Sequence, residues 1–505
     1  MRIENQKKIG SVITLLFYLL YFYIFANEDS ISENLKSRIM SITKKSNQIN
    51  RRSFLKRLGA GTALTLTGCA VSKSDKESDG EEFVSNGKLT YRINPKTGDR
   101  VSLLGFGCTR FPTVDDPELE ETGNNIDQEG VNRLIDAALE AGVNYFDTAP
   151  SYCRGFSERA LGEALSRHPR DKYFIATKLS NFAQSTWPRE QSLEMYKNSF
   201  KELKTDYIDY MLLHNIGYGG FDQFEKRFIK NGMIDFLADE REAGRIRNYG
   251  FSYHGDIRAF EYLLEMHDKY KWDFAQIQLN YVDWKHAKEV NSINTNAEYL
   301  YNELEKRKIP VVIMEPLLGG RLANVNNQVA SLMKQKRPED SIASWAIRYA
   351  GSPEGVLSVL SGMVYIEHLR DNIKTYSPLV PVSESDMEFL EDVAQIMLSY
   401  PTVPCNDCKY CMPCPYGLDI PGILSHYNKC VNEGSAPSSS RYPEYEKARK
   451  KFLVSYDRAI PKRRQAEHCI ACEECVIHCP QNIDIPAELA RIDRYIEDLK
   501  QNTLS

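Results

Sequence analysis

Between residues 101 and 376, short β-rich runs alternate eight times with longer stretches of helical period, and this alternation constrains the fold most strongly. The strand candidates are Ser102–Gly107, Asn144–Thr148, Tyr173–Lys178, Ile208–His214, Arg247–Ser252, Phe274–Leu279, Val311–Glu315 and Gly355–Ser361. The helix candidates are Gln128–Ala141, Glu158–Ser166, Glu190–Leu203, Ile229–Ala243, Ile257–Tyr270, Ala297–Lys308, Ile342–Ala350 and Glu367–Thr375. Such a series predicts an α/β protein with a closed (β/α)8 TIM barrel rather than an open sheet.

The cysteines are concentrated near the C-terminal end. Of twelve, only Cys69, Cys108 and Cys153 precede residue 400. Two runs follow, Cys405-x2-Cys408-x2-Cys411-x2-Cys414-Pro415 and Cys469-x2-Cys472-x2-Cys475-x3-Cys479-Pro480, each with Asp-Ile-Pro downstream. This repeat resembles a two-cluster ferredoxin, in which closely spaced thiolates hold three corners of an iron–sulfur cube. The resemblance implies a small ferredoxin-like domain with two [4Fe–4S] clusters.

In such repeats the fourth cysteine crosses to the other cluster. The resemblance therefore implies two ligand sets: Cys405, Cys408, Cys411 and Cys479 for one cluster, and Cys469, Cys472, Cys475 and Cys414 for the other. The first run departs from the pattern, with two residues rather than three before its last cysteine. Paired Cys-x2-Cys units also form zinc ribbons, so structural zinc is the alternative. Cys430 lies outside both runs and is expected to be a buried thiol.

Chemistry in such barrels takes place where the strands end in loops, at the C-terminal face. Three successive strand ends carry Asp147 with Tyr152 five residues later, then Lys178, then His214. Together with Gly105-Phe106-Gly107 and Ser157-Glu158, these residues resemble the aldo/keto reductase family over residues 87–381. In that family an aspartate, a tyrosine, a lysine and a histidine occupy the corresponding positions.

The resemblance implies a carbonyl reduction in which hydride reaches carbon and a proton reaches oxygen. A free tyrosine, with a pKa of about 10, holds its proton tightly near neutrality. We expect Lys178 to lower the pKa of Tyr152, Asp147 to keep Lys178 charged, and His214 to orient the carbonyl oxygen. The alternative is that each residue is an ordinary solvated cap, a turn or a packing residue.

The family's nicotinamide contacts are matched in part. Ser252 and Gln276 correspond to residues near the nicotinamide, and Asp371 and Asn372 to residues near the adenine. Where the family brings lysine and arginine to the 2′-phosphate of NADP, this chain has Gly362 and His368, with Arg370 nearby. The resemblance implies an NAD(P)(H) cofactor and leaves the choice between NAD and NADP open.

The N-terminal region resembles an export signal. Arg51-Arg52-x-Phe54-Leu55-Lys56 precedes an apolar stretch, as in twin-arginine signals, and Leu66-Thr67-Gly68-Cys69 resembles a lipobox. We therefore expect an exported protein on the periplasmic or cell-envelope side, attached to the membrane by lipid at Cys69. The upstream apolar segment Ile9–Ala26 is either an anchor or part of an over-extended start before Met40. Without a working signal the protein would be cytoplasmic.

These patterns divide the chain into seven parts. They are residues 1–39, the apolar upstream segment; 40–69, the signal; 70–86, a flexible linker; 87–381, the barrel; 382–404, a linking helix; 405–490, the iron–sulfur domain; and 491–505, a C-terminal tail.

Three functions of different kinds fit the sequence. The first is an oxidoreductase that interconverts a small-molecule carbonyl and alcohol with a nicotinamide and exchanges electrons through the clusters, with a redox partner protein. The second is an electron-transfer protein with a catalytically silent barrel. The third is a lipid-tethered binding protein with structural zinc. With a net charge of −5, the chain lacks the excess of positive charge that is typical of proteins that bind nucleic acid.

Overall fold

The computed structural model describes residues 89–114 and 124–505. The predictions for residues 1–86, namely the apolar upstream segment, the export signal with Cys69 and the linker, lie outside the described residues. In the part of the chain that the structure describes, no helix is both long and apolar enough to cross a membrane.

Eight parallel strands form a closed barrel, which confirms the predicted fold class. They follow one another in chain order, and the last pairs with the first. The strands are β3 (Leu104–Gly107), β4 (Tyr145–Asp147), β5 (Phe174–Leu179), β6 (Ile208–Leu213), β7 (Ile246–Ser252), β8 (Phe274–Gln278), β9 (Val311–Met314) and β10 (Val356–Ser361). Each lies within two residues of its predicted bounds, because each is a short apolar run that ends in a turn.

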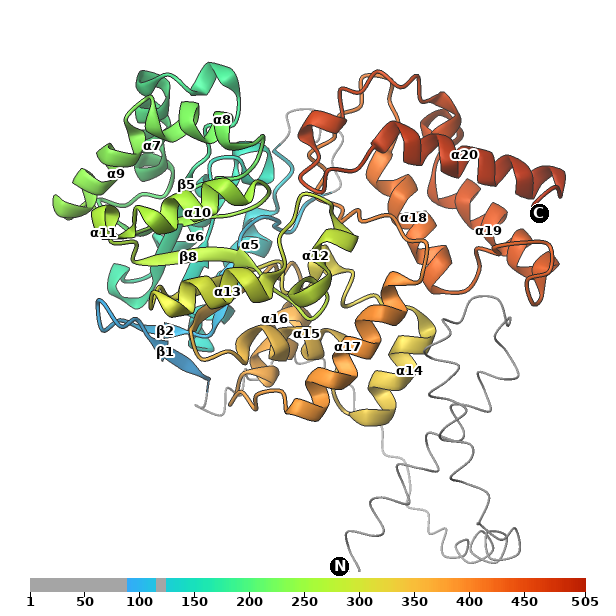
Figure 1. The fold of residues 1–505 in the computed structure, drawn as a ribbon, viewed down its shortest axis with the longest axis horizontal. Coiled ribbons are helices and arrows are strands. Elements are labelled where there is room, and N and C mark those ends of the chain that lie inside the picture. The colour runs from blue at the N-terminus through green and yellow to red at the C-terminus, as the bar shows by residue number, and fades with distance from the viewer. Residues whose placement is uncertain (1–88, 115–123) are drawn as a thin grey trace, which may run out of the picture. The chain divides into compact units, whose positions relative to one another are not determined.

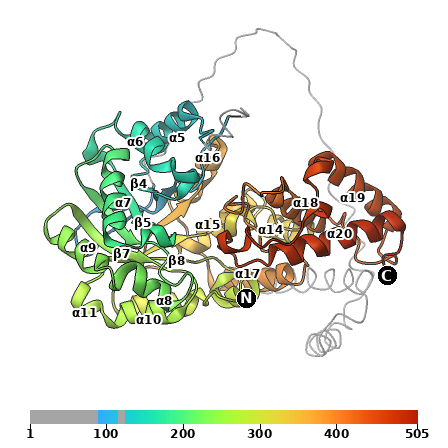
Figure 2. The same ribbon diagram turned by 90° about the horizontal axis from the view of Figure 1, so that it is seen from above.

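Helices cover the outside of the barrel (Figure 1, Figure 2). They are α5 (Gln128–Glu140), α6 (Ser157–Leu165), α7 (Arg189–Glu202), α8 (Phe221–Phe224), α9 (Met233–Glu242), α10 (Ile257–Glu265), α11 (His267–Tyr270), α12 (Asp283–Val290), α13 (Ala297–Lys306), α14 (Asn327–Lys336), α15 (Ile342–Gly351), α16 (Ile366–Thr375) and α17 (Glu384–Leu398). The last of these is the predicted linking helix. Its Leu390, Val393 and Ala394 are buried in the barrel's hydrophobic core, so it stabilises the barrel as well as linking.

A β-hairpin precedes the barrel. Strands β1 (Tyr91–Ile93) and β2 (Arg100–Ser102) pair antiparallel around a turn that begins at Asn94. The side-chain amide of Asn94 donates hydrogen bonds of 3.1 Å to Tyr210 and to Asn248. Both partners lie in the first half of their strands, so the hairpin covers the end of the barrel opposite the predicted site.

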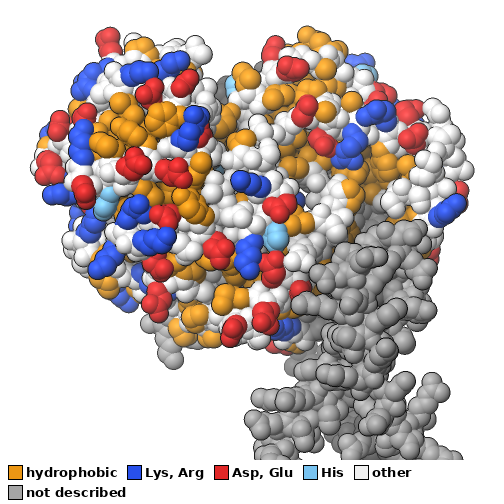
Figure 3. Space-filling view, viewed as in Figure 1, with side chains coloured by type: hydrophobic (Ala, Val, Ile, Leu, Met, Phe, Trp, Pro, Cys, Tyr) orange, Lys and Arg blue, Asp and Glu red, His pale blue; other side chains and the backbone are white. Residues whose placement is uncertain are grey.

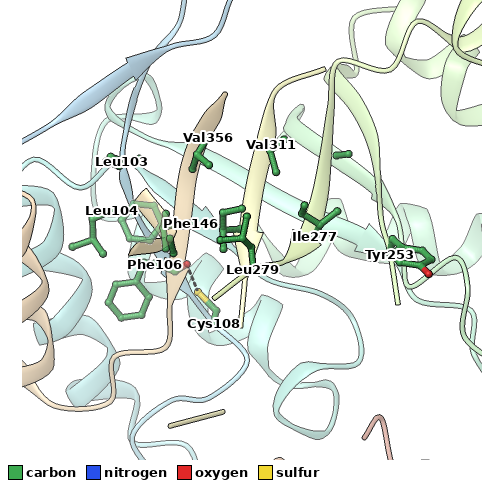
Figure 4. Packing of buried hydrophobic residues seen from close by; sticks show 14 of the residues in the cluster. Leu103, Leu104, Phe106, Cys108, Phe146, Tyr253, Ile277, Leu279, Val311 and Val356 are labelled. Carbon is green, nitrogen blue, oxygen red and sulfur yellow. Dashed lines mark hydrogen bonds between the residues drawn. The ribbon is translucent and has the colours of Figure 1, made fainter. Parts of the chain in front are cut away.

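The period of two along each strand separates two hydrophobic cores. Phe106 and Phe146 belong to the larger core between strands and helices (Figure 4), with ring centroids 6.0 Å apart. Tyr145 and Ala176 belong instead to the smaller core, which also contains Tyr210. Asp147 is two residues beyond Tyr145 on the same side of its strand, so the strand period directs its carboxylate inward, at the mouth of the barrel.

Three further helices form the core of the C-terminal region. Helices α18 (Ile420–Asn432), α19 (Tyr445–Ala459) and α20 (Ile485–Gln501) lie side by side (Figure 1, Figure 2). The repeated Asp-Ile-Pro marks two of their starts, because Asp419 and Asp484 cap α18 and α20 and a proline lies in each first turn.

The domain boundary that the sequence predicts after residue 490 falls inside helix α20. Ile492, Ile496 and Leu499 of this helix are buried in the core of the C-terminal region. The helix is amphipathic, and its buried face continues across the predicted boundary. Residues 491–501 are therefore part of that region and not a separate tail.

The face of the molecule in Figure 3 mixes charges of both signs. Basic and acidic side chains are interspersed over the barrel, with hydrophobic side chains between them. This mixture accords with the small net charge of −5. That nucleic acid is not a partner stays a prediction.

Candidate active site and cluster-binding loops

The four residues that the sequence predicts as a catalytic set lie together at the carboxyl ends of the barrel strands. Asp147 ends β4, Lys178 lies near the end of β5, and His214 directly follows β6. Lys178 Nζ is 2.6 Å from Asp147 Oδ1 and 4.9 Å from the centroid of the Tyr152 ring. The ring centroids of Tyr152 and His214 are 5.7 Å apart. The structure thus brings all four side chains to one place, while their catalytic roles stay a prediction.

Asp147 and Lys178 form a buried ion pair with further partners. The ammonium group also donates to the carbonyl of Thr148 at 2.8 Å, and Gln276 Nε2 donates to Asp147 Oδ2 at 3.0 Å. Burial raises the pKa of Asp147, and the charge of Lys178 opposes that rise. Removing one partner of a buried ion pair typically lowers the free energy of unfolding by about 3–5 kcal/mol. This pair therefore holds the side chains of the site in fixed positions.

Tyr152 is positioned by an unusual turn. It begins the short 3-10 segment Tyr152–Gly155, in which Cys153 and Arg154 have φ angles of 49° and 55°. These left-handed conformations are strained for residues other than glycine. Tyr152 as a whole residue is half-buried, and its phenol hydrogen-bonds to the side chain of Thr109. The turn therefore directs the phenol to the mouth of the barrel.

The expected effect of Lys178 on Tyr152 is not what the structure shows. The pKa of Tyr152 is raised well above its ordinary value, first by burial and then by the negative charge of Asp147. Lys178 is paired with Asp147 at 2.6 Å, so little of its positive charge acts on the phenol alone. Tyr152 is consequently protonated at neutral pH, which suits a proton donor.

His214 is a neutral imidazole with one nitrogen engaged. Burial and the positive charges of Lys178 and Arg227 lower its pKa well below the ordinary value. Its Nδ1 lies 2.6 Å from the hydroxyl of Ser180. The Arg227 guanidinium, which is fully buried, donates to the carbonyl of His214 at 2.6 Å. His214 is thus held from both its ring and its backbone.

Sequence reasoning missed Ser180 and Arg227. Ser180 follows Lys178 by two residues, and the strand period places both side chains on the same side of the chain. That signal was available in the sequence. Arg227 lies in a single-turn π-helix, Glu225–Ile229, within a segment whose sequence gives no sign of the buried arginine's partners.

The buried carboxyl group of Glu158 lies against strand β5, which also carries Lys178. Glu158, on α6 and only 3% exposed, accepts a 2.5 Å hydrogen bond from Thr177 Oγ1 of β5. Burial raises the pKa of Glu158 to about 7, against the opposing effect of that hydrogen bond. Near neutral pH this carboxyl group is therefore partly protonated.

This shift predicts a pH dependence of stability. A carboxyl pKa that is higher in the folded state than in the unfolded state destabilises the fold as pH rises, here between about pH 4.5 and pH 7. The corresponding loss in the free energy of unfolding is about 2–3 kcal/mol, and we expect Glu158→Gln to abolish it. The measurement is the thermal unfolding midpoint as a function of pH. Glu163→Gln, on the exposed side of the same helix, is the control, and equal pH slopes for both variants would contradict the prediction.

The predicted nicotinamide contacts fall into two groups. Ser252 Oγ accepts a 2.8 Å bond from the backbone of Asn215, and Gln276 donates to Asp147, so both lie beside the catalytic set. Asn372 Nδ2 instead donates to Ser361 Oγ at 2.9 Å, and Asp371 accepts from Ser341 Oγ at 2.5 Å. The first pair fits a nicotinamide at the barrel mouth, whereas the second pair is engaged in holding β10, α15 and α16 together.

The eight cysteines of the two runs form two groups. They are Cys405, Cys408, Cys411 and Cys479 in the first, and Cys414, Cys469, Cys472 and Cys475 in the second. Burial raises the pKa of the Cys411 thiol, and the three other thiols of its group raise it further. The second group lines a small cavity of its own. Each group gathers four sulfur donors, which fits an iron–sulfur cube, and the groups coincide with the crossed sets that the ferredoxin resemblance implies.

Two further cysteines of the described residues, Cys430 and Cys153, lie outside these groups. Cys430 is buried on α18, with its sulfur 3.3 Å from His426 Nε2. Burial raises the pKa of Cys153 to about 11, so this thiol is not an activated nucleophile.

The loop that begins the first cysteine group contacts the barrel mouth. Arg110, after β3, donates to the carbonyl of Asn406, whose amide donates to Glu315 Oε1 at 3.2 Å. From the second run, the carbonyl of Ile477 accepts a 2.6 Å bond from Tyr218. Between these contacts lies a cavity of about 760 Å³, lined by barrel loops and by both cysteine runs.

Comparison with known proteins agrees with this division of the chain. Residues 104–395 match the model of the aldo/keto reductase family, and residues 404–483 match that of a 4Fe-4S dicluster domain. Because the first match spans more than half of the 505 residues, the chain belongs to the aldo/keto reductase family of oxidoreductases. The second match favours iron–sulfur ligation over the zinc alternative.

Similar proteins include two curated enzymes and one solved structure. The chain is 25% identical to an L-galactose dehydrogenase of Arabidopsis thaliana over 328 residues, which are 61% of this chain and 95% of the relative. It is 25% identical to an NADH-specific methylglyoxal reductase of Escherichia coli over 302 residues, 52% of this chain and 88% of the relative. An aldo-keto reductase structure from Bacillus halodurans aligns with a TM-score of 0.47 and 22% identity, covering 60% of this chain and 96% of its own.

Proposed function

We propose that the protein interconverts a small-molecule carbonyl and its alcohol with a nicotinamide cofactor, and that it exchanges electrons through two [4Fe–4S] clusters. The observation that carries the proposal is the arrangement of Tyr152 and His214 over the buried Asp147–Lys178 pair. Membership of the aldo/keto reductase family supports it. One similar enzyme is named as NADH-specific, and the choice of nicotinamide for this chain stays open.

In this mechanism Tyr152 donates its proton to the carbonyl oxygen as negative charge develops there. The raised pKa of the phenol is compatible with this role, because an alkoxide is a far stronger base than a phenolate. Ser180 Oγ and His214 Nδ1 lie 2.6 Å apart, and either atom can donate. In this mechanism Ser180 is the donor, so that the proton of the neutral imidazole is on Nε2 and holds the carbonyl oxygen beside Tyr152. A nicotinamide held beside Ser252 and Gln276 would supply or accept the hydride, and clusters held by the two cysteine groups would carry single electrons.

The test is an anaerobic preparation of the whole protein, assayed for iron, labile sulfide and bound nucleotide on one sample. We expect iron with equimolar sulfide, binding of NADH or NADPH, and nicotinamide-dependent reduction of simple aldehydes. A holoprotein that neither contains nor binds a nicotinamide, and reduces no aldehyde, would contradict the proposal.

A catalytically silent barrel is the second candidate. It is favoured by the hydrogen bond of Asn372 to Ser361, which engages an amide that the family resemblance assigns to cofactor binding. Electron transfer through the clusters without carbonyl turnover would establish this function.

We also propose that the protein is exported and attached to the membrane through lipid at Cys69. The twin-arginine-like and lipobox-like sequences support the proposal. Metabolic labelling with a fatty acid in the native host tests it. We expect label and membrane association in the full chain and neither in Cys69→Ala; an unlabelled protein in the cytoplasmic fraction would overturn it.

A further inference from the structure

The side chain of Arg321, in the loop that follows β9, contacts the segment that leads into the first cysteine group. Its Nη2 donates to Thr402 Oγ1 at 3.3 Å. Thr402 is three residues before Cys405, the first cysteine of that group. In the same barrel loop, Glu315 accepts a 3.2 Å bond from Asn406, which directly follows Cys405. These two contacts, one on each side of Cys405, place Arg321 beside the first cysteine group.

The positive charge of Arg321 is not neutralised by a direct ion pair with any described residue. Its Nη1 is buried, and within the described ranges this atom has no hydrogen-bond partner. Burial lowers the pKa of the guanidinium group, and the negative charges of Asp283, Cys405 and Glu315 oppose that effect. An arginine side chain keeps its proton in a protein. A full positive charge therefore acts on its surroundings, which include Cys405.

The two carboxylates that act on Arg321 are hydrogen-bonded to other groups. Asp283, at the start of α12 and 1% exposed, accepts bonds of 2.5 Å at Oδ2 from the amides of Gln278 and Asn280. Glu315 is bonded to the cysteine loop through Oε1. These bonds fix both carboxylates, so they weaken the field of Arg321 without forming an ion pair with it.

The unpartnered Nη1 of Arg321 fits an anionic group that the polypeptide itself does not supply. A buried donor without a partner is rare in folded proteins and calls for such an explanation. Four thiolates give an iron–sulfur cluster a negative charge, and one-electron reduction makes the cluster more negative. A cation in nearby low-dielectric surroundings therefore stabilises the reduced cluster more than the oxidised one.

We infer that Arg321 makes the reduction potential of the cluster in the first cysteine group more positive, and that Asp283 opposes it. Arg321 is neither a ligand nor a catalytic residue, because it acts on the cluster through its charge. The inference rests on the proposed function for the presence of this cluster and not for carbonyl turnover. In the second group Cys472 is exposed, so water screens nearby charges and that cluster serves as an internal reference.

A redox titration of the anaerobic holoprotein, followed by electron paramagnetic resonance, tests the inference. In Arg321→Gln we expect a more negative potential for one cluster. The ratio of reduced to oxidised cluster at a fixed applied potential should fall about tenfold, the order expected for one unit charge in partly buried surroundings. Arg321→Lys keeps the charge and should restore most of the wild-type potential. Arg441→Gln, which removes an exposed arginine between α18 and α19, is the control and should change neither potential.

Asp283→Asn tests the same charges with the opposite sign. Burial raises the pKa of Asp283 to about 6, so this carboxyl group is ionised at pH 8, where the titrations are made. Removing its charge should shift the same potential to a more positive value. This variant decides the question if Arg321→Gln does not retain its iron.

Iron and labile sulfide are measured on every sample, and Cys479→Ser identifies the cluster. Because Cys479→Ser is expected to remove the first cluster, adding Arg321→Gln to it should leave the remaining potential unchanged. Unaltered potentials in Arg321→Gln and Asp283→Asn at full iron content, or a shift confined to the second cluster, would overturn the inference. If the potentials shift as expected but no aldehyde is reduced, the proposed carbonyl reaction fails and the role of Arg321 stands. A holoprotein without iron would overturn both.

Discussion

Replacing Tyr152 by phenylalanine is expected to lower the turnover of an aldehyde probe by about 10²–10⁴-fold, the usual contribution of a positioned general acid. The substitution removes only the hydroxyl group that we propose as proton donor. The ring remains, so its contacts with Lys178 and His214 are kept. The measurement is kcat for the wild type and the variant, prepared anaerobically and matched in iron content.

The control for this experiment is Tyr365→Phe. Tyr365 also lines the cavity, but its side chain is 63% exposed, and no catalytic role is proposed for it. We expect Tyr365→Phe to retain most of the activity and both variants to bind nucleotide as the wild type does. Activity that survives in Tyr152→Phe would show that another group donates the proton, and the assignment of the acid would then be wrong.

Replacing Cys479 by serine is expected to remove one cluster and about half of the iron and labile sulfide. Cys479 belongs to the second cysteine run in sequence, but in the structure it joins the group that begins at Cys405. The cluster lost should therefore be the one bound mainly by the first run. Iron and sulfide analysis with electron paramagnetic resonance of the reduced protein measures the loss.

Paired substitutions decide whether the ligands cross. With crossing, Cys479→Ser combined with Cys408→Ser affects one cluster twice and leaves about half of the iron, whereas Cys479→Ser combined with Cys472→Ser removes both clusters. Without crossing, the two results exchange. Cys430→Ser is the matched control, because its buried thiol lies outside both groups and its replacement should leave the iron content unchanged.

The barrel could be predicted because the sequence patterns that indicate its strands are local. Each strand is a short apolar run that ends in a turn, and the residues at three strand ends converge because parallel strands in a barrel end at one face. Asp147, Lys178 and His214 stood out at these strand ends, and the resemblance to the aldo/keto reductase family implied their roles. The Asp-Ile-Pro repeat was visible, but its physical meaning, a capped helix start after each cysteine run, needed the backbone conformation.

The rest depends on contacts between distant residues. The raised pKa of Tyr152 results from burial and from Asp147, which together outweigh a lysine that is already paired. The partners of Arg227 and the extent of α20 depend on tertiary packing. The cavity at the barrel mouth depends on the contact between the barrel and the cysteine-rich region, through Arg110, Asn406 and Glu315. No sequence motif in either region indicates that contact.

The hydrogen bond from Tyr218 to the carbonyl of Ile477 has a consequence for maturation. Ile477 lies in the loop that leads to Cys479, and the course of that loop is expected to be fixed only when iron is bound. In a newly made chain that has not yet received iron, the cysteine-rich side of the cavity at the barrel mouth would then lack a defined conformation. The cavity would be complete only in chains that hold their clusters.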